Sequence, residues 1–100
     1  EYGYTPLHEA AQSGTPANIK ALLAAGADVM ARAMAGWTPL HSAASARLAG
    51  SPANIQALLN AGADAKAKNE KGKTPWDLVQ ENEKLKNTKG YWALNDAQYN

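Results

Sequence analysis

The 100-residue sequence has no cysteine and no phenylalanine. Without cysteine there is neither a disulfide framework nor thiol chemistry, which suits a cytoplasmic protein and an exported bacterial one equally and leaves the compartment open. No stretch approaches the roughly 18 consecutive apolar residues of a membrane-spanning helix, so membrane insertion is not expected. The formal net charge of +1 provides no overall attraction to nucleic acid or to an anionic membrane.

Alanine, in contrast, is abundant, with 22 copies in a chain whose hydrophobic fraction is 45%. A core that is rich in alanine and lacks phenylalanine predicts closely packed helices with small contact residues. Residues 68–92 contain no alanine, so the composition changes toward the C-terminus. We therefore expect the last part of the chain to differ in structure from the part before it.

A short motif occurs three times, beginning at Thr5, Thr38 and Thr74. The copies read TPLHEA, TPLHSA and TPWDLV, and their starts are 33 and 36 residues apart. A second motif at residues 16–28 returns at residues 52–64 with only two differences. The chain is therefore a repeat protein with two clear copies and one divergent copy.

Each unit is predicted to form two helices and a turn. A threonine stands where an N-cap belongs, and a proline follows at the first helical position, where its missing N–H costs nothing. Ile19, Leu22 and Leu23 have the spacing of one helix face, and Gly26 stands where a left-handed C-terminal cap is needed. The expected helices cover residues 6–13 and 39–47, then stretches that begin at Pro16 and Pro52, then about 75–87 and about 89–98.

This pattern resembles the ankyrin repeat, in which Thr-Pro-Leu-His-x-Ala opens a helix pair with a 33-residue period. The resemblance covers about residues 3–82. Within the family, the chain is similar to short bacterial ankyrin-repeat proteins. It implies an all-α solenoid of stacked helix-turn-helix units, with short hairpin fingers and a helical C-terminal cap. We expect a single domain over residues 1–100, with units at about 3–35, 36–71 and 72–100.

The chain departs from the family pattern in its fingers. The family's usual aspartate before the repeat glycine is Ala33 in one finger and Asn69 in the other. The usual asparagine after Gly-Ala-Asp-Val is replaced by Met30 and Lys66. These replacements remove side-chain hydrogen bonds to the finger backbone, so we expect looser fingers than in an ideal repeat.

The middle unit also carries three extra residues within residues 45–51. Three residues make nearly one helical turn, so either the first helix of this unit is longer or the loop before the second helix bulges. Arg47 and Leu48 in this insertion are a second candidate contact.

The motif histidines invite a zinc-site interpretation, because His-Glu-x-x-His places two imidazoles on one helix face. Gln12 stands where the second ligand would follow His8, so we expect no metal. The serines fall at helix surfaces and caps, and no glycine-rich phosphate loop is present. The sequence therefore predicts a non-catalytic protein without a cofactor.

In the ankyrin family the motif histidine binds the threonine hydroxyl and neighbouring backbone. The resemblance implies this role for His8 with Thr5 and for His41 with Thr38. Asp77 takes the third position in place of the histidine.

The resemblance implies that a protein partner binds to the face formed by the fingers and first helices. Trp and Tyr are common interface anchors because they supply large rigid area at small entropy cost. Packing of Trp37 over Met34 or the neighbouring finger is the structural alternative, and solubility is the alternative for the lysines. The candidate partner-binding residues are Tyr4, Glu9, Gln12, Arg32, Met34, Trp37, Ser42, Ser45, Lys68, Glu70, Lys71 and Lys73.

Two other functions stay open. The segment could regulate or target a larger enzyme or effector protein. Nucleic-acid binding through Lys66, Lys68, Lys71 and Lys73 is the weaker alternative, and we do not expect a nucleic-acid partner.

The two ends of the repeat array differ. The last unit has polar and apolar faces, as a terminal cap requires. The first unit has the same small and apolar residues as the second, including Ala10, Ala11 and Leu22. We therefore expect its open end to pack against an upstream repeat or another chain.

Overall fold

The computed structural model describes residues 3–46, 51–83 and 85–99. Within these residues there are six α-helices, one short 3-10 helix and no β-strand. None of the described helices is long and apolar enough to cross a membrane. The helices are α1 (Pro6–Ser13), α2 (Pro16–Ala24), η1 (Met34–Gly36), α3 (Pro39–Ser45), α4 (Ser51–Asn60), α5 (Pro75–Gln80) and α6 (Lys89–Ala97).

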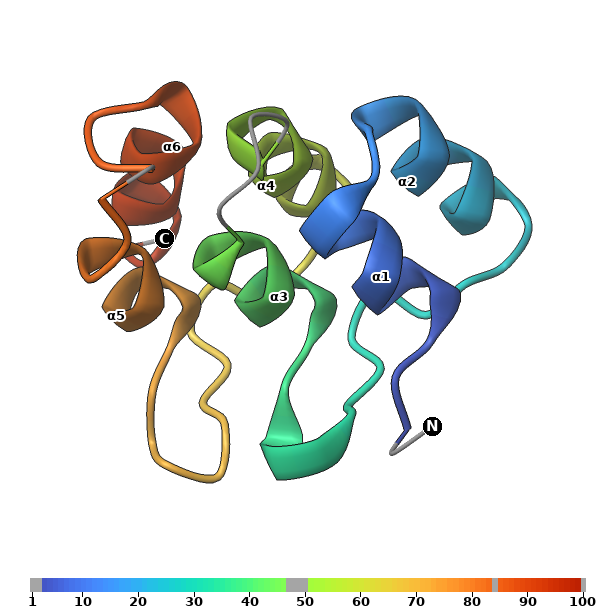
Figure 1. Cartoon of the computed structure of the whole chain (residues 1–100), viewed down its shortest axis with the longest axis horizontal. Helices are drawn as coiled ribbons and strands as arrows, with labels where there is room; N and C mark the ends of the chain where they lie inside the picture. The colour runs from blue at the N-terminus through green and yellow to red at the C-terminus, as the bar shows by residue number, and fades with distance from the viewer. Residues whose placement is uncertain (1–2, 47–50, 84, 100) are drawn as a thin grey trace.

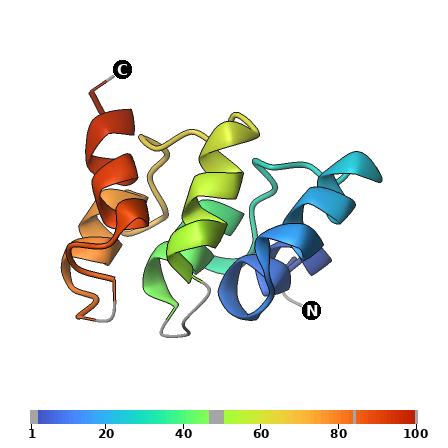
Figure 2. The ribbon, with the colours of Figure 1, turned by 90° about the horizontal axis from the view of Figure 1, so that it is seen from above.

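The helices form three pairs that stack side by side, α1 with α2, α3 with α4, and α5 with α6 (Figures 1 and 2). The long connections after α2 and α4 extend away from the helices on one side (Figure 1). The expected solenoid of helix-turn-helix units with projecting fingers and a helical C-terminal unit is confirmed.

Threonine caps begin the helices as the sequence predicts. Thr5, Thr38 and Thr74 each accept a hydrogen bond from the backbone N–H three residues later, and the side chain at that later position bonds back to the threonine N–H. Thr15 and Thr88 accept the equivalent bond at the starts of α2 and α6. Each cap satisfies backbone donors that a helix N-terminus leaves unpaired.

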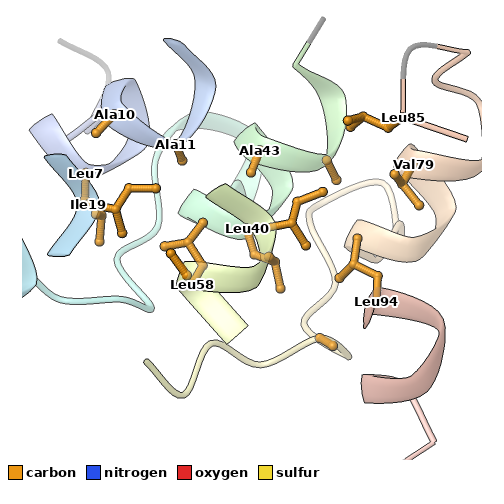
Figure 3. Close-up of a cluster of buried hydrophobic side chains, with 14 residues drawn as sticks. Leu7, Ala10, Ala11, Ile19, Leu40, Ala43, Leu58, Val79, Leu85 and Leu94 are labelled. Carbon is orange, nitrogen blue, oxygen red and sulfur yellow. The ribbon is translucent and has the colours of Figure 1, made fainter. Parts of the chain in front are cut away.

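The core consists of aliphatic side chains from all three helix pairs (Figure 3). Leu7, Ile19, Leu40 and Leu58 are fully buried, and alanines such as Ala43 lie among them, so the helices approach closely. The third pair adds a further set of buried side chains, Val79, Leu85 and Leu94.

Two predicted helix ends are wrong. The helix that begins at Pro75 ends at Gln80 instead of continuing to about Asn87, where the backbone is left-handed with φ 66°. Leu85 is nevertheless buried, so this connection packs on the core without being helical.

The first helix of the middle unit ends at Ser45, so it is not lengthened by the insertion. The other alternative, a bulged loop before α4, falls on residues 47–50. Arg47 and Leu48 fall in residues 47–50, outside the described residues.

The C-terminal unit packs on the middle unit through a glycine. A Cβ atom at Gly90 would lie 2.6 Å from the carbonyl oxygen of Pro52, so only glycine allows this approach of α6 to α4. Leu94 is buried on the same helix, whereas Trp92 and Tyr99 are 49% and 78% exposed. The cap therefore has the expected apolar inner side, but its outer side exposes two aromatic rings.

Candidate functional site

The two fingers, residues 27–37 (first finger) and 63–73 (second finger), are closed in the same way. The Ala33 N–H donates to the carbonyl of Trp37 at 2.8 Å, and the Asn69 N–H donates to the carbonyl of Lys73 at 2.9 Å. Trp37 and Lys73 thus stand at the base of each finger, directly before a helix cap. These bonds hold the backbone at both positions.

A buried histidine ties each finger base to the preceding repeat. His8 Nε2 donates to the Trp37 carbonyl at 2.9 Å, and His41 Nε2 donates to the Lys73 carbonyl at 2.9 Å. The Nδ1 atoms of both rings accept from the cap threonine N–H, so the proton resides on Nε2. The expected histidine role is confirmed, and it extends to the next repeat.

Burial lowers the pKa of His41 below its ordinary value of 6.5, because the interior penalises the charged ring. The hydrogen bond to the Lys73 carbonyl opposes this shift, and the positive charge of Arg32 adds to it. His41 is therefore held in the neutral form that its bonds require.

Asp77 forms the cap bond of the motif histidine but not its bond to a finger. Its Oδ2 accepts from the Thr74 N–H at 2.9 Å, which completes the cap. A carboxylate has no proton to donate to a carbonyl, so the third unit cannot extend the bond to a further finger.

The expectation that Asn69 removes side-chain hydrogen bonds from the second finger is wrong. Asn69 Oδ1 accepts from the N–H groups of Lys71 and Lys73 at 2.9 and 3.0 Å, so the amide oxygen provides the bonds expected of an aspartate. Ala33 provides no such bonds in the first finger. There the chain forms η1, and Ala35 adopts a left-handed φ of 62°.

The two fingers are also bonded to each other. Arg32 Nη1 donates to the carbonyls of Gly36 and Lys68 at 3.0 and 2.7 Å, and the Glu70 N–H donates to the Ala35 carbonyl at 2.8 Å. Ala35 thus has a left-handed conformation, and its own carbonyl faces the second finger. Arg32, expected at the partner interface, braces the fingers with its guanidinium.

The backbone near Tyr4 lies against the first finger, as the first finger lies against the second. A Cβ atom at Gly3 would lie 3.3 Å from Ala33 Cα, and one at Gly36 would lie 3.2 Å from the Glu70 nitrogen. The segment before α1 and the two fingers therefore form one continuous row.

Tyr4 and Trp37 occupy equivalent positions in this row. The Tyr4 ring is edge-on to His8 at 5.4 Å, and the Trp37 ring lies 5.9 Å from His41. Tyr4 is 42% exposed, Met34 is 52% exposed and Trp37 is half-buried. Trp37 thus packs beside the motif histidine of its own repeat.

The row continues with charged residues. Lys73 is half-buried, and its Nζ lies 3.3 Å from Glu81 Oε2. Lys68, Glu70 and Lys71 are exposed. We call the following set the finger surface: Tyr4, Arg32, Met34, Trp37, Lys68, Glu70, Lys71 and Lys73.

Ser42 does not belong to an accessible surface, and its selection as a contact residue is wrong. It is 4% exposed, because α3 is the middle first helix and packs against α1 on one side and α5 on the other. Ser45 is half-buried, and its hydroxyl donates to the Ser42 carbonyl at 3.2 Å. Glu9 and Gln12 are exposed on α1.

Two features of the structure, the conformation of Ala35 and the exposure of Trp92, could not be predicted from the sequence. The strain at Ala35 has no residue-type signal, because alanine rarely adopts positive φ. The exposure of Trp92 contradicts its apolar type.

Among the described residues no group of three or more histidine or acidic side chains lies close enough to hold a metal ion.

Comparison with known proteins identifies relatives. Residues 1–69 match the family model described as "Ankyrin repeats (3 copies)". The chain is 51% identical over 43 residues to the human "Protein phosphatase 1 regulatory subunit 27". That match covers 43% of this chain and 28% of the relative. The relative is human, so the expectation of a bacterial source finds no support.

Proposed function

Because the chain belongs to the ankyrin-repeat family, whose members generally mediate protein–protein interactions, we propose that it binds a protein partner through the finger surface. One observation carries this proposal. Tyr4 and Trp37 present aromatic rings at equivalent positions, beside two fingers that hydrogen bonds join to each other. The role is non-catalytic.

The fixed backbone matters for affinity. Binding costs free energy when loops and side chains must be ordered, and a preformed surface avoids part of that cost. Arg32 and the Glu70 N–H join the two fingers before any partner arrives. Aromatic side chains on such a frame are typical binding hot spots.

The experiment compares two tryptophans. Trp37→Ala removes a ring from the finger surface, and Trp92→Ala removes one from the C-terminal unit as the matched control. Each variant is immobilised and exposed to an extract of the cells that naturally make this protein. The amount of protein that each variant captures is then measured. We expect Trp37→Ala to lose captured protein roughly tenfold or more and Trp92→Ala to retain it.

Equal capture by both variants would contradict the proposal. Circular dichroism must show that each variant is folded at the capture temperature, because Trp37 also contacts His41. A steep loss of nucleic acid from the captured material with added salt would instead support the lysine interpretation.

A second candidate follows from the named relative. That protein is a regulatory subunit of protein phosphatase 1, which favours the alternative that this segment regulates or targets an enzyme. Titration calorimetry with purified protein phosphatase 1 tests it directly. Binding that Trp37→Ala weakens and Trp92→Ala does not would support this candidate, and absence of binding would remove the phosphatase as a partner.

A further inference from the structure

The finger surface is apolar at one end of the row and charged at the other. Tyr4 and Met34 are 42% and 52% exposed, and Trp37 is half-buried. We call these three residues the apolar end. The positions of the second finger that are equivalent to Met34 and Trp37 hold Glu70 and Lys73. A partner that lies along the row therefore meets two different chemistries.

The second finger carries an excess of positive charge. Residues 63–73 contain four lysines against two carboxylates, a net charge of +2. Ala65 and Ala67 are each 5% exposed, whereas Lys66 and Lys68, which alternate with them, are exposed. Lys71 is exposed in the turn that follows. These lysines are therefore on the solvent side of the finger.

Arg32 adds a positive charge where the two fingers meet. Its Nη1 donates to the carbonyls of Gly36 and Lys68 at 3.0 and 2.7 Å. Both acceptors are uncharged, so these bonds hold the guanidinium in place without neutralising it. Lys73, in contrast, has its Nζ 3.3 Å from Glu81 Oε2. We call the following three residues the basic end: Arg32, Lys68 and Lys71.

This arrangement fits an acidic protein segment better than a nucleic acid. The affinity of a nucleic acid depends largely on how many phosphates of its backbone are neutralised. Glu70 lies among the lysines, where it repels a phosphate backbone, and the apolar end contains no cation. A protein segment that combines an apolar side chain with a short cluster of carboxylates is complementary to both ends of the row.

We propose that the finger surface recognises a segment of the protein partner in which an apolar anchor stands next to a cluster of aspartate or glutamate residues. The anchor contacts Tyr4 and Trp37, and the carboxylates lie over the basic end. This inference rests on the proposed function and adds the chemistry of the partner. Complementary charges of this kind determine the direction in which the segment lies and disfavour other partners.

Peptide selection tests the preference for acidic residues. A phage library of random short peptides is selected in parallel on the immobilised full chain, on Lys68→Glu/Lys71→Glu and on Lys20→Glu/Lys89→Glu. The last variant is the matched control, because it makes the same change in charge at exposed residues of α2 and α6, away from the projecting fingers (Figure 1). The finger variant retains the backbone bonds of positions 68 and 71, so the finger should keep its shape.

The composition of the selected peptides is the first readout. We expect the full chain and the control variant to select peptides with roughly twice the acidic content of the starting library, next to an aromatic or aliphatic residue. Lys68→Glu/Lys71→Glu should lose this excess and select basic residues instead, because its finger then carries negative charge.

The affinity of one selected acidic peptide, measured by fluorescence anisotropy, is the second readout. We expect roughly tenfold weaker binding to both Trp37→Ala and Lys68→Glu/Lys71→Glu. Replacing the acidic residues of the peptide by lysine should restore binding to Lys68→Glu/Lys71→Glu. Unchanged binding to Trp37→Ala would contradict the proposed function together with this inference. Selected peptides that bind Trp37→Ala weakly but have no acidic excess would overturn this inference alone.

Three other results would also overturn the inference. An equal acidic excess with all three proteins would place recognition outside the basic end. The absence of any enriched peptide would exclude a short segment as the recognised element. A single-stranded RNA that binds the full chain more tightly than the selected peptide, and that does not bind Lys68→Glu/Lys71→Glu, would assign the basic end to nucleic acid.

Discussion

The bond from His41 to the next finger can be isolated by His41→Asn. Asn18 already shows that asparagine at this position of a helix can complete a threonine cap. The substitution therefore retains the cap with Thr38 and removes the Nε2 donor that reaches Lys73. Within the described residues, no other side chain of α3 forms a hydrogen bond to the second finger, so the variant loses this contact.

The magnitude follows from what remains. The Lys73 carbonyl still accepts from the Asn69 N–H, so it is not left unpaired, and the lost bond is worth about 0.5–1.5 kcal/mol. Loss of the ring contact with Trp37 adds about 0.5–1.5 kcal/mol. The variant should be less stable by about 1–3 kcal/mol, which lowers the midpoint by roughly 4 °C or more in a domain of this size.

Urea unfolding followed by circular dichroism measures this difference. Asp77→Asn is the matched control, because Asp77 caps Thr74 and has no bond to a following finger. It should change stability by less than about 0.5 kcal/mol. Equal losses in His41→Asn and Asp77→Asn would refute a stabilising bond between repeats.

Three further predictions concern stability. Burial lowers the pKa of His41 below 6.5, so the unfolded chain binds a proton at this ring more readily than the folded chain does. The stabilising contribution of neutral His41 should therefore be complete above pH 6.5 and decrease as the pH falls below it. Urea unfolding at pH values between 7.5 and 5.5 measures this change. Ala35→Gly should raise stability by about 1 kcal/mol in the same assay, since it relieves a left-handed φ of 62°. Gly90→Ala should lower it by about 1–3 kcal/mol, because the added methyl group would meet Pro52 at 2.6 Å.

Each of these has a contradicting result. A pH dependence that persists unchanged in His41→Asn would assign it to other groups. A loss of stability in Ala35→Gly would mean that the left-handed conformation is not strained in this finger. A gain in Gly90→Ala would mean that helix propensity outweighs the contact between α4 and α6.

The repeat positions and the caps were predictable from the sequence. Thr5 and Thr38 each precede a proline, and this local chemistry determines where the helices begin. The histidine role followed from the family resemblance. The burial of Ser42 was not predictable from its residue type, because it depends on the helix stacked against it.

The finger geometry was predicted less well for a physical reason. Asn69 and Ala33 both differ from the family aspartate, but only Asn69 retains an acceptor oxygen. The carbonyl of the left-handed Ala35 accepts a hydrogen bond from the N–H of Glu70, a residue of the next repeat. Such contacts between repeats are invisible in a pattern that is read one repeat at a time.

The proposed contact between a protein partner and the finger surface can be tested directly. A photo-crosslinking side chain at position 37, with the same group at position 92 as the control, tests it in extracts of producing cells. We expect a crosslinked protein from position 37 and none from position 92. Crosslinking from position 92 alone, or from neither position, would contradict it.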